Sequence, residues 1–178
     1  MKYAMTTVLL ALVFQAPLHA HELGELIPHD AGDGWKTVDI EGASLSWSES
    51  DDRFSFSLEA PAGGWVSIGF GGGPAMRDAN LVIGYADDEG AHLRDDHGTS
   101  PISHSPDTDN GGSDDLIDGN VTETDGYTVM SFSLPKEPSD ELDPALQAGE
   151  TIRILVAWSD SDGFSGMHTE AHTAELEL

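Results

Sequence analysis

Apolar and polar residues alternate along many short stretches of this 178-residue chain. Phe54, Phe56 and Leu58, for example, fall on one side of an extended chain, and polar residues fall on the other. This period of two is typical of a strand that buries one of its faces. The same pattern predicts strands over residues 35–40, 43–48, 53–58, 65–70, 81–85, 91–97, 116–124, 127–134, 151–158 and 172–178.

Glycine, proline and aspartate residues separate these stretches and indicate tight connections between strands. Asp125-Gly126 stands between two predicted strands and is a good signal for a hairpin turn. No long stretch carries a helical period, and residues 137–147 are expected to form one or two helical turns at most. About ten short strands with such connections predict an all-β fold, an antiparallel β-sandwich in a single domain.

The first 20 residues have the pattern of a secretory signal peptide. A lysine provides a positive start, residues 8–14 are apolar, and Ala20 is a small residue at the expected cleavage point. Residues 21–34 are polar and are expected to form a flexible lead to a folded domain over residues 35–178. No later segment has the length of a membrane span, so we expect a periplasmic or secreted product that is not inserted in a membrane.

Acidic residues outnumber basic ones by 33 to 7, which gives a formal net charge of −26 at pH 7. Nucleic acids and anionic lipids are bound through Lys and Arg, so this excess argues against both as partners. The chain contains no cysteine, which excludes disulfides, thiolate metal sites and covalent C-x-x-C-H haem attachment. Any haem would therefore be held non-covalently.

The stretch from Gly64 to Tyr85 holds the most informative motif of the chain. It reads as a strand, a glycine-rich turn over residues 71–74, a lone methionine at Met76, and a second strand. A thioether held at the edge of a β-structure is a soft, neutral ligand for a metal or for haem iron. Methionine also fills irregular gaps against apolar neighbours, and the motif by itself leaves both interpretations open.

Two histidines lie near the end of the chain. In the last predicted strand, His172 shares a face with Leu176 and Leu178, which are expected to point into the core. His168 would share that face as well if the extended conformation began earlier. Glycines in the preceding loop make it flexible enough to bend over a ligand.

Together, these segments resemble a DOMON domain, and the resemblance covers residues 35–178. The matching pattern is a glycine-tryptophan pair, a glycine-phenylalanine pair, the methionine, an apolar strand ending in an aromatic residue, and a late apolar strand followed by a histidine. These positions are Gly64-Trp65, Gly69-Phe70, Met76, residues 81–85, Ala157-Trp158, and either His168 or His172. Asn80 stands where the family pattern has aspartate.

The resemblance implies an immunoglobulin-like antiparallel β-sandwich that binds either haem or sugars. Haem-binding members resemble the cytochrome domain of cellobiose dehydrogenase and hold haem b between a methionine and a histidine. Carried over to this chain, that pair is Met76 and His168, with His172 as the fallback ligand. Aromatic residues expected as pocket walls or core are Trp65, Phe70 and Trp158.

The function that follows from the resemblance is single-electron transfer between redox partners. Methionine and histidine ligation raises the reduction potential of haem iron. Filling both axial positions leaves no ready place for oxygen or substrate, which favours an electron carrier over an enzyme. The chain also lacks a nucleophile elbow, a P-loop and a dinucleotide fingerprint. The partner would be a redox protein or a small-molecule donor or acceptor.

An acidic loop offers a separate, possible calcium site. Asp107, Asp109, Asp114 and Asp115 concentrate hard oxygen ligands around two glycines, and Ca²⁺ takes six to eight oxygens. The spacing lacks the full EF-hand pattern, and a solvated acidic loop is the alternative interpretation.

Two further functions compete with haem binding. A haem-free DOMON module would bind sugar or another extracellular ligand through exposed tryptophan and tyrosine side chains. A copper protein would use His21, which becomes N-terminal after cleavage, because an amine and an imidazole together chelate Cu(II). The candidate partner histidines are His29, His92, His97 and His104.

Overall fold

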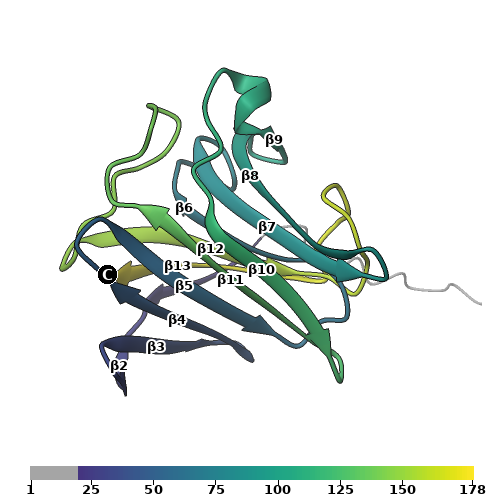
Figure 1. Ribbon diagram of the computed structural model, residues 1–178, viewed down its shortest axis with the longest axis horizontal. Coiled ribbons are helices and arrows are strands. Elements are labelled where there is room, and N and C mark those ends of the chain that lie inside the picture. The colour runs from purple at the N-terminus through teal and green to yellow at the C-terminus, as the bar shows by residue number, and fades with distance from the viewer. Residues whose placement is uncertain (1–19) are drawn as a thin grey trace, which may run out of the picture.

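The structure is a computed structural model that describes residues 20–178, so the predicted signal peptide, apart from Ala20, lies outside the described residues. The described chain folds into two β-sheets packed as a sandwich (Figure 1). Helical structure within residues 20–178 is confined to the short 3₁₀ helix η1 (Asp107–Asn110). No helix in this part of the chain is long and apolar enough to cross a membrane.

One sheet has seven strands, with β1 and β9 at its two edges. In spatial order it contains β1 (His21–Glu25), β13 (Glu170–Glu177), β12 (Thr151–Trp158), β6 (Val66–Gly71), β7 (Ala79–Asp87), β8 (Gly90–Ser100) and β9 (Ser103–Pro106). All neighbours in this sheet are antiparallel except β1, which runs parallel to β13.

The second sheet has six strands and is antiparallel throughout. In spatial order it contains β10 (Ile117–Thr124), β11 (Tyr127–Pro135), β5 (Arg53–Ala60), β4 (Ala43–Glu49), β3 (Trp35–Ile40) and β2 (His29–Gly32). The predicted turn at Asp125-Gly126 joins β10 to β11, and both of its residues have positive φ angles, as such a turn requires.

All ten predicted strands are present, and the prediction of an all-β sandwich is confirmed. Three short strands were not predicted, and two of them, β1 and β2, lie in residues 21–34, the segment expected to lead into the domain. Nearly all of their side chains are exposed, and backbone pairing with β13 and β3 holds them in place. Hydrophobic periodicity does not detect such strands. Residues 137–147 form bends rather than helical turns.

Alternate residues of the two sheets meet in one core. Phe56 of β5 lies within it, with its ring centroid 4.9 Å from that of Phe70 in β6 and 5.4 Å from that of Phe132 in β11. Because Phe70 comes from the opposite sheet, this aromatic contact joins the two layers of the sandwich.

Strands β6 and β7 bury both of their faces. Ile68, Phe70 and Val82 point into the core between the sheets. Gly69 and Leu81 alternate with these residues and belong to the opposite side of the seven-stranded sheet, which we call the outer face. The candidate site lies on this outer face.

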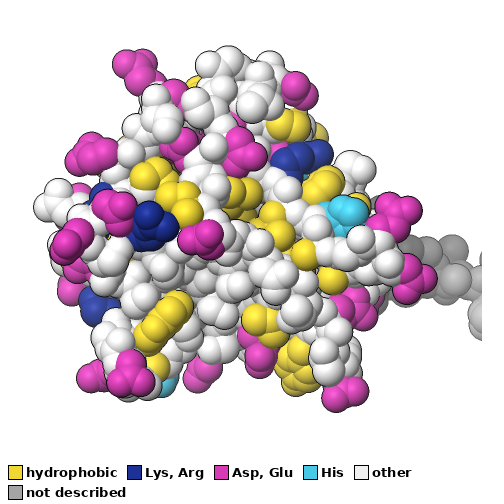
Figure 2. All heavy atoms as spheres, in the orientation of Figure 1, with side chains coloured by type: hydrophobic (Ala, Val, Ile, Leu, Met, Phe, Trp, Pro, Cys, Tyr) yellow, Lys and Arg dark blue, Asp and Glu magenta, His cyan; other side chains and the backbone are white. Residues whose placement is uncertain are grey.

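Acidic side chains dominate the surface. Figure 2 shows Asp and Glu spread around the periphery of one view of the molecule, with few Lys or Arg side chains among them. This distribution agrees with a formal net charge of −26 and keeps the surface strongly hydrated.

Replacing Phe56 by alanine is expected to lower the free energy of unfolding by about 3–5 kcal/mol, because the change removes a buried ring and leaves a cavity. Denaturant unfolding measures this loss. The control is Ile102→Ala, whose side chain is 84% exposed and whose loss should stay below about 0.5 kcal/mol. A Phe56→Ala loss no larger than that of the control would contradict the role of Phe56 in joining the layers.

Candidate functional site

A row of three residues forms the floor of the outer face. Leu155 of β12, Gly69 of β6 and Leu81 of β7 are paired across the sheet. A Cβ on Gly69 would lie 2.6 Å from Leu81 Cδ2 and 3.2 Å from Leu155 Cδ1, so glycine lets the two leucines close over the strand. Leu81 is only 5% exposed and Leu155 8%, although the other sheet formed by residues 20–178 packs on the opposite side.

Met76 packs onto this row from the turn that follows β6. It is half-buried and contacts a small apolar cluster of Ala79, Leu81 and Leu155 that is separate from the main core. The sequence left two interpretations of Met76 open, and its packing on these apolar residues of the outer face is compatible with both.

Backbone hydrogen bonds fix the shape of the turn that carries Met76. The Gly73 N–H donates to the Arg77 carbonyl at 2.7 Å, and the Ala79 N–H donates to the Met76 carbonyl at 3.1 Å. The Asp78 N–H donates to the carbonyl of Gly98 in β8 at 2.7 Å. The turn is therefore tied to itself and to the neighbouring strand.

Two further residues hold the same turn against the sheet. The Arg153 guanidinium donates to the carbonyls of Gly71 at 3.3 Å and Ala75 at 3.2 Å. Gly98 allows the backbone of the turn to approach β8, since a Cβ there would lie 1.6 Å from the Met76 carbonyl oxygen. Neither residue was singled out from the sequence, because both act through backbone atoms of a distant segment.

His168 belongs to the loop of residues 159–169, which connects β12 to β13. The Ser159 N–H donates to the Trp65 carbonyl at 3.0 Å, and the Thr169 N–H donates to the Trp158 carbonyl at 2.8 Å. These bonds anchor both ends of the loop to the sheet.

Phe164, in the middle of this loop, folds back over the outer face. Its ring centroid lies 5.1 Å from that of Tyr85 in β7, and the Arg94 guanidinium lies 4.3 Å from the Phe164 centroid. Tyr85 lies on the same side of β7 as Leu81, and Arg94 is the cross-strand partner of Ile83, so these contacts place the loop on the outer face.

The His168 side chain is half-buried, and burial lowers the pKa of its imidazole. The sign of this shift favours the neutral imidazole at neutral pH, which is the form that binds metal. Within residues 20–178 the imidazole makes no hydrogen bond, so its nitrogens are not committed to another group of the described chain.

The turn of Met76 and the loop of His168 approach the outer face from opposite ends. The turn follows the last residue of β6 and the loop follows the last residue of β12, and these two strands are antiparallel neighbours. The floor of Gly69, Leu81 and Leu155 lies near the end where the turn of Met76 begins.

The structure places His172 on the other side of the sheet. It points into the sandwich with Ala174 and Leu176, as its parity predicts, and its ring centroid lies 5.3 Å from that of Trp158. Both ring nitrogens are buried without a hydrogen-bond partner. Burial lowers the pKa of His172, and the neighbouring Glu170 opposes this shift. His172 does not share the face of Met76.

The predicted aromatic residues divide between the core and the loop. Phe70 and Trp158 lie in the core, so they are not pocket walls on the side of Met76. Trp65 is buried beside the loop that carries His168, where a Cβ on Gly166 would lie 3.2 Å from the indole Nε1.

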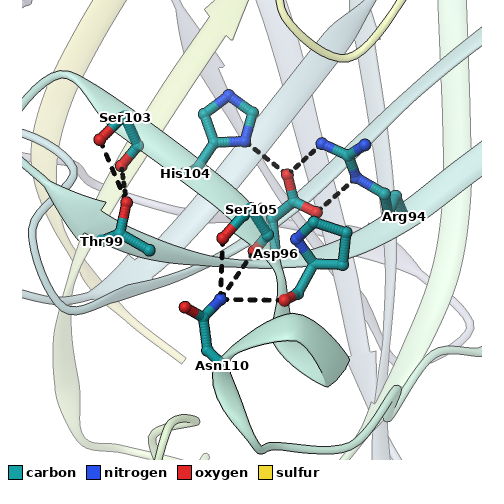
Figure 3. A network of polar contacts seen from close by, with 8 residues as sticks. Arg94, Asp96, Thr99, Ser103, His104, Ser105 and Asn110 are labelled. Carbon is teal, nitrogen blue, oxygen red and sulfur yellow. Dashed lines mark hydrogen bonds and ion pairs between the residues drawn. The ribbon is translucent and has the colours of Figure 1, made fainter.

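A polar network borders the outer face at β8 and β9 (Figure 3). The Asp96 carboxylate is fully buried and accepts hydrogen bonds from the Arg94 guanidinium, one of them at 2.7 Å, and pairs with His104 Nδ1. Burial alone would raise the pKa of Asp96, but the contacts with His104 and Arg94 outweigh it and hold that pKa below its ordinary value. The network therefore fixes the Arg94 guanidinium under the Phe164 ring.

Asp96→Asn is expected to lower the free energy of unfolding at pH 7 by about 3 kcal/mol, since it removes the anionic partner of a buried network. The folded-state pKa of Asp96 lies below the unfolded value, so this stabilisation is present above the unfolded pKa and is lost as pH falls through the folded pKa. Denaturant unfolding at pH 7 and in acid measures both effects. The exposed Asp51→Asn is the control, and an Asp96→Asn deficit that persists unchanged in acid would contradict the electrostatic explanation.

The four aspartates predicted as a calcium site do not assemble as one. Asp109 and Asp114 are exposed, whereas Asp107 and Asp115 are buried, and Asp115 accepts the backbone N–H of Ser139 at 2.7 Å. The fold instead separates these side chains between the solvent and the interior, because η1 turns Asp107 inward and Asp109 outward.

Asp107 joins a different set of buried carboxylates. Asp95 of β8 and Asp143 of the β11–β12 connection each offer an oxygen within 4.8 Å of the others. Burial first, with the neighbouring carboxylates adding to it, raises the pKa of Asp95 to about 7 and that of Asp143 to about 8. No local pattern predicts this set, since its three members are separated by 12 and 36 residues of chain.

The candidate copper partners of His21 are not its neighbours in the structure. His92, His97 and His104 lie on β8 and β9, at the opposite edge of the sheet from β1, and His29 belongs to the other sheet. The residue beside His21 is its register partner His172, with ring centroids 6.4 Å apart.

The described chain exposes few aromatic side chains on which a sugar ring could stack. Trp47, Trp65 and Trp158 are buried, and Tyr127 is the large aromatic residue that stands out as exposed in residues 20–178. A groove of about 590 Å³ runs between the β1–β2 connection and β3, where Trp35 is half-buried. This groove is separate from the outer face.

The DOMON domain model matches residues 39–159, which is more than half of the chain, and the chain therefore belongs to the DOMON family. Its fold is similar to that of the cytochrome b domain of pyranose dehydrogenase from Coprinopsis cinerea, with 15% identity, 75% of each chain covered and a TM-score of 0.56. It is also similar to the cytochrome domain of Myriococcum thermophilum cellobiose dehydrogenase, with 12% identity, 86% of this chain and 88% of that chain covered, and a TM-score of 0.53. At these identities the likeness establishes the fold.

Proposed function

We propose that this protein is an exported b-type cytochrome domain that passes single electrons between redox partners, with Met76 and His168 as the axial ligands. The observation that carries the proposal is the pair of loops that approach one outer face from opposite ends, one with the half-buried Met76 and the other with the half-buried His168, whose imidazole makes no hydrogen bond within residues 20–178. The two solved cytochrome domains of the same fold support it.

The residues present fit a non-covalently bound haem b. Thioether and neutral imidazole are both neutral ligands for haem iron, and the chain has no cysteine for covalent attachment. The floor of Gly69, Leu81 and Leu155 is apolar, and the two leucine side chains that close over the glycine would form its contact with a bound ring. When bound, haem supplies a one-electron redox centre.

The protein groups have distinct roles in this proposal. Arg153 and the Gly98 carbonyl hold the turn of Met76, which fixes where the thioether lies. Arg94 holds Phe164, which keeps the loop of His168 over the outer face and excludes water from it. Burial keeps His168 neutral and able to bind through a ring nitrogen.

The excess of acidic residues suggests what kind of partner would dock. A surface with this charge favours a partner with a basic face and speeds their encounter at low ionic strength. We therefore propose a redox protein or domain with a positive surface as donor or acceptor, in the periplasm or outside the cell.

Met76→Ala and His168→Ala are expected to abolish the six-coordinate low-spin spectrum of the haem-loaded protein, because each removes one axial ligand. Absorbance spectra of the oxidised and dithionite-reduced protein measure this through the α and β bands. Controls are Met167→Ala, whose side chain is 66% exposed, and His29→Ala on the other sheet, and both should retain the spectrum.

His172→Leu tests the choice of histidine directly. It keeps an apolar side chain against Trp158 and should leave the spectrum unchanged, because His172 points into the sandwich. Loss of the low-spin bands in His172→Leu with their retention in His168→Ala would overturn the assignment of His168.

Gly98→Ala is expected to weaken haem binding while leaving both ligands in the chain. The added Cβ would overlap the Met76 carbonyl oxygen, so the turn must move away from β8. Hemin titration measures the change, which we expect to be roughly tenfold or more in Kd if the turn shift costs about 1.4 kcal/mol of binding energy. Gly63→Ala is the matched control, since its Cβ would lie 3.4 Å from the nearest atom.

A haem-free module that binds sugar is the second candidate. The groove beside Trp35 has a volume in the range of small-molecule sites and contains His29, Asp30 and Lys36 as polar groups. This candidate would lead if the protein failed to take up hemin and a Trp35→Ala variant lost binding to an oligosaccharide.

A further inference from the structure

Three buried carboxylates meet away from the outer face. Asp95 comes from β8, Asp107 from η1 and Asp143 from the connection between β11 and β12, and oxygens of all three lie within 4.8 Å of one another. A cation with oxygen ligands at about 2.4 Å would span such separations.

Most oxygens of this cluster have no partner in the described chain. Asp95 Oδ2 accepts the Asp115 N–H at 2.9 Å, but Asp95 Oδ1 and both oxygens of Asp107 and Asp143 are buried without a hydrogen bond. Buried carboxylate oxygens are costly unless they are hydrogen-bonded or paired with positive charge.

Asn80 provides an independent indication of a ligand at the same place. It is 2% exposed, and its amide oxygen also lacks a hydrogen-bond partner. Asn80 and Asp143 line one cavity of about 10 Å³, which is about the volume needed to hold one water molecule or one ion. With this oxygen, the four residues offer six buried oxygens without a hydrogen-bond partner, and Ca²⁺ takes six to eight oxygen ligands.

Within residues 20–178 no Lys or Arg side chain pairs with these carboxylates, and the positive group that acts on them is the His97 imidazole, which when protonated would favour the ionised form of Asp107. The ion pairs within residues 20–178 include none to Asp95, Asp107 or Asp143, and Arg94 is paired with Asp96 instead. Three carboxyl groups this close must therefore share protons or bind a cation from solution.

We infer that Asp95, Asp107, Asp143 and the amide oxygen of Asn80 bind one hard divalent cation of the Ca²⁺ class. The donor set consists of oxygens alone, which suits such cations rather than thiophilic metals. This set shares only Asp107 with the aspartates that the sequence singled out.

The cation would link segments that are distant in sequence. Asp95 and Asn80 are on neighbouring strands, η1 follows β9, and Asp143 lies on a connection with no regular secondary structure. Asn80 is the second residue of β7, which follows the turn of Met76, so the ion would hold the start of that strand. The site is separate from the outer face, and its test requires no haem.

The test compares metal binding by the EDTA-treated, full-length protein and its variants. Calorimetric titration with CaCl₂ should give one saturable site in the wild type, and Ca²⁺ at a hundred times its Kd should raise the Tm by roughly 5–10 °C. Asp107→Asn and Asp143→Asn should each weaken binding at least tenfold. Asp109→Asn, on the same helix but exposed, should bind as the wild type does.

The variants also separate a cation site from carboxyl groups that only share protons. For a cation site, Asp107→Asn is expected to be at least as stable as the wild type in EDTA, because it removes a repelling charge, and to show no Tm increase with CaCl₂. The inference is overturned if CaCl₂, MgCl₂ and MnCl₂ at matched ionic strength all fail to bind saturably up to about 10 mM. Equal binding by the wild type, Asp107→Asn and Asp143→Asn would overturn it as well.

Discussion

Burial of β6 and β7 on both faces is the constraint on which the rest of the structure depends. In an antiparallel sandwich one face of each sheet packs on the core, and the other usually meets water. Here Leu81 and Leu155 make the outer face apolar, and Gly69 lets them meet. The turn of Met76 packs on these leucines, and the loop of His168 folds over the same face farther along, where Phe164 contacts Tyr85. The apolar floor and the candidate ligands are thus parts of one arrangement.

Positive charge is scarce in this chain and is used for internal structure. Arg94 joins the buried Asp96 to the Phe164 ring, Arg153 holds the turn of Met76, and Lys136 pairs with Glu49. These contacts leave few basic groups to balance the remaining negative charge. Dissolved salt screens the acidic groups on the surface, but it screens the buried carboxylates much less. Aspartate therefore adds screened negative charge at the surface, whereas in the interior it adds negative charge that salt screens poorly.

The sequence predicted those parts of the fold that depend on side-chain burial. All ten strands with an apolar face were predicted, because alternation reports directly on that face. β1, β2 and β9 were missed, since backbone pairing holds them, the side chains of β1 and β2 are mostly exposed, and β9 has no fully buried residue. Met76 was found as an apolar residue in a polar turn. The contributions of Gly98, Arg153 and Asp143 depend on contacts between distant segments, which no local pattern contains.

The pairing of β1 with β13 has a consequence for how the sheet edge is protected. This pairing joins residues from the two ends of the described chain, so it is a contact of very high sequence separation and is expected to form late in folding. Because the side chains of β1 contribute little to the core, the strand can detach while the sandwich stays intact. Detachment would expose the free edge of β13, whose unpaired backbone groups could then accept a strand from another molecule. The first residues of the folded segment therefore act as a cover against intermolecular β-pairing.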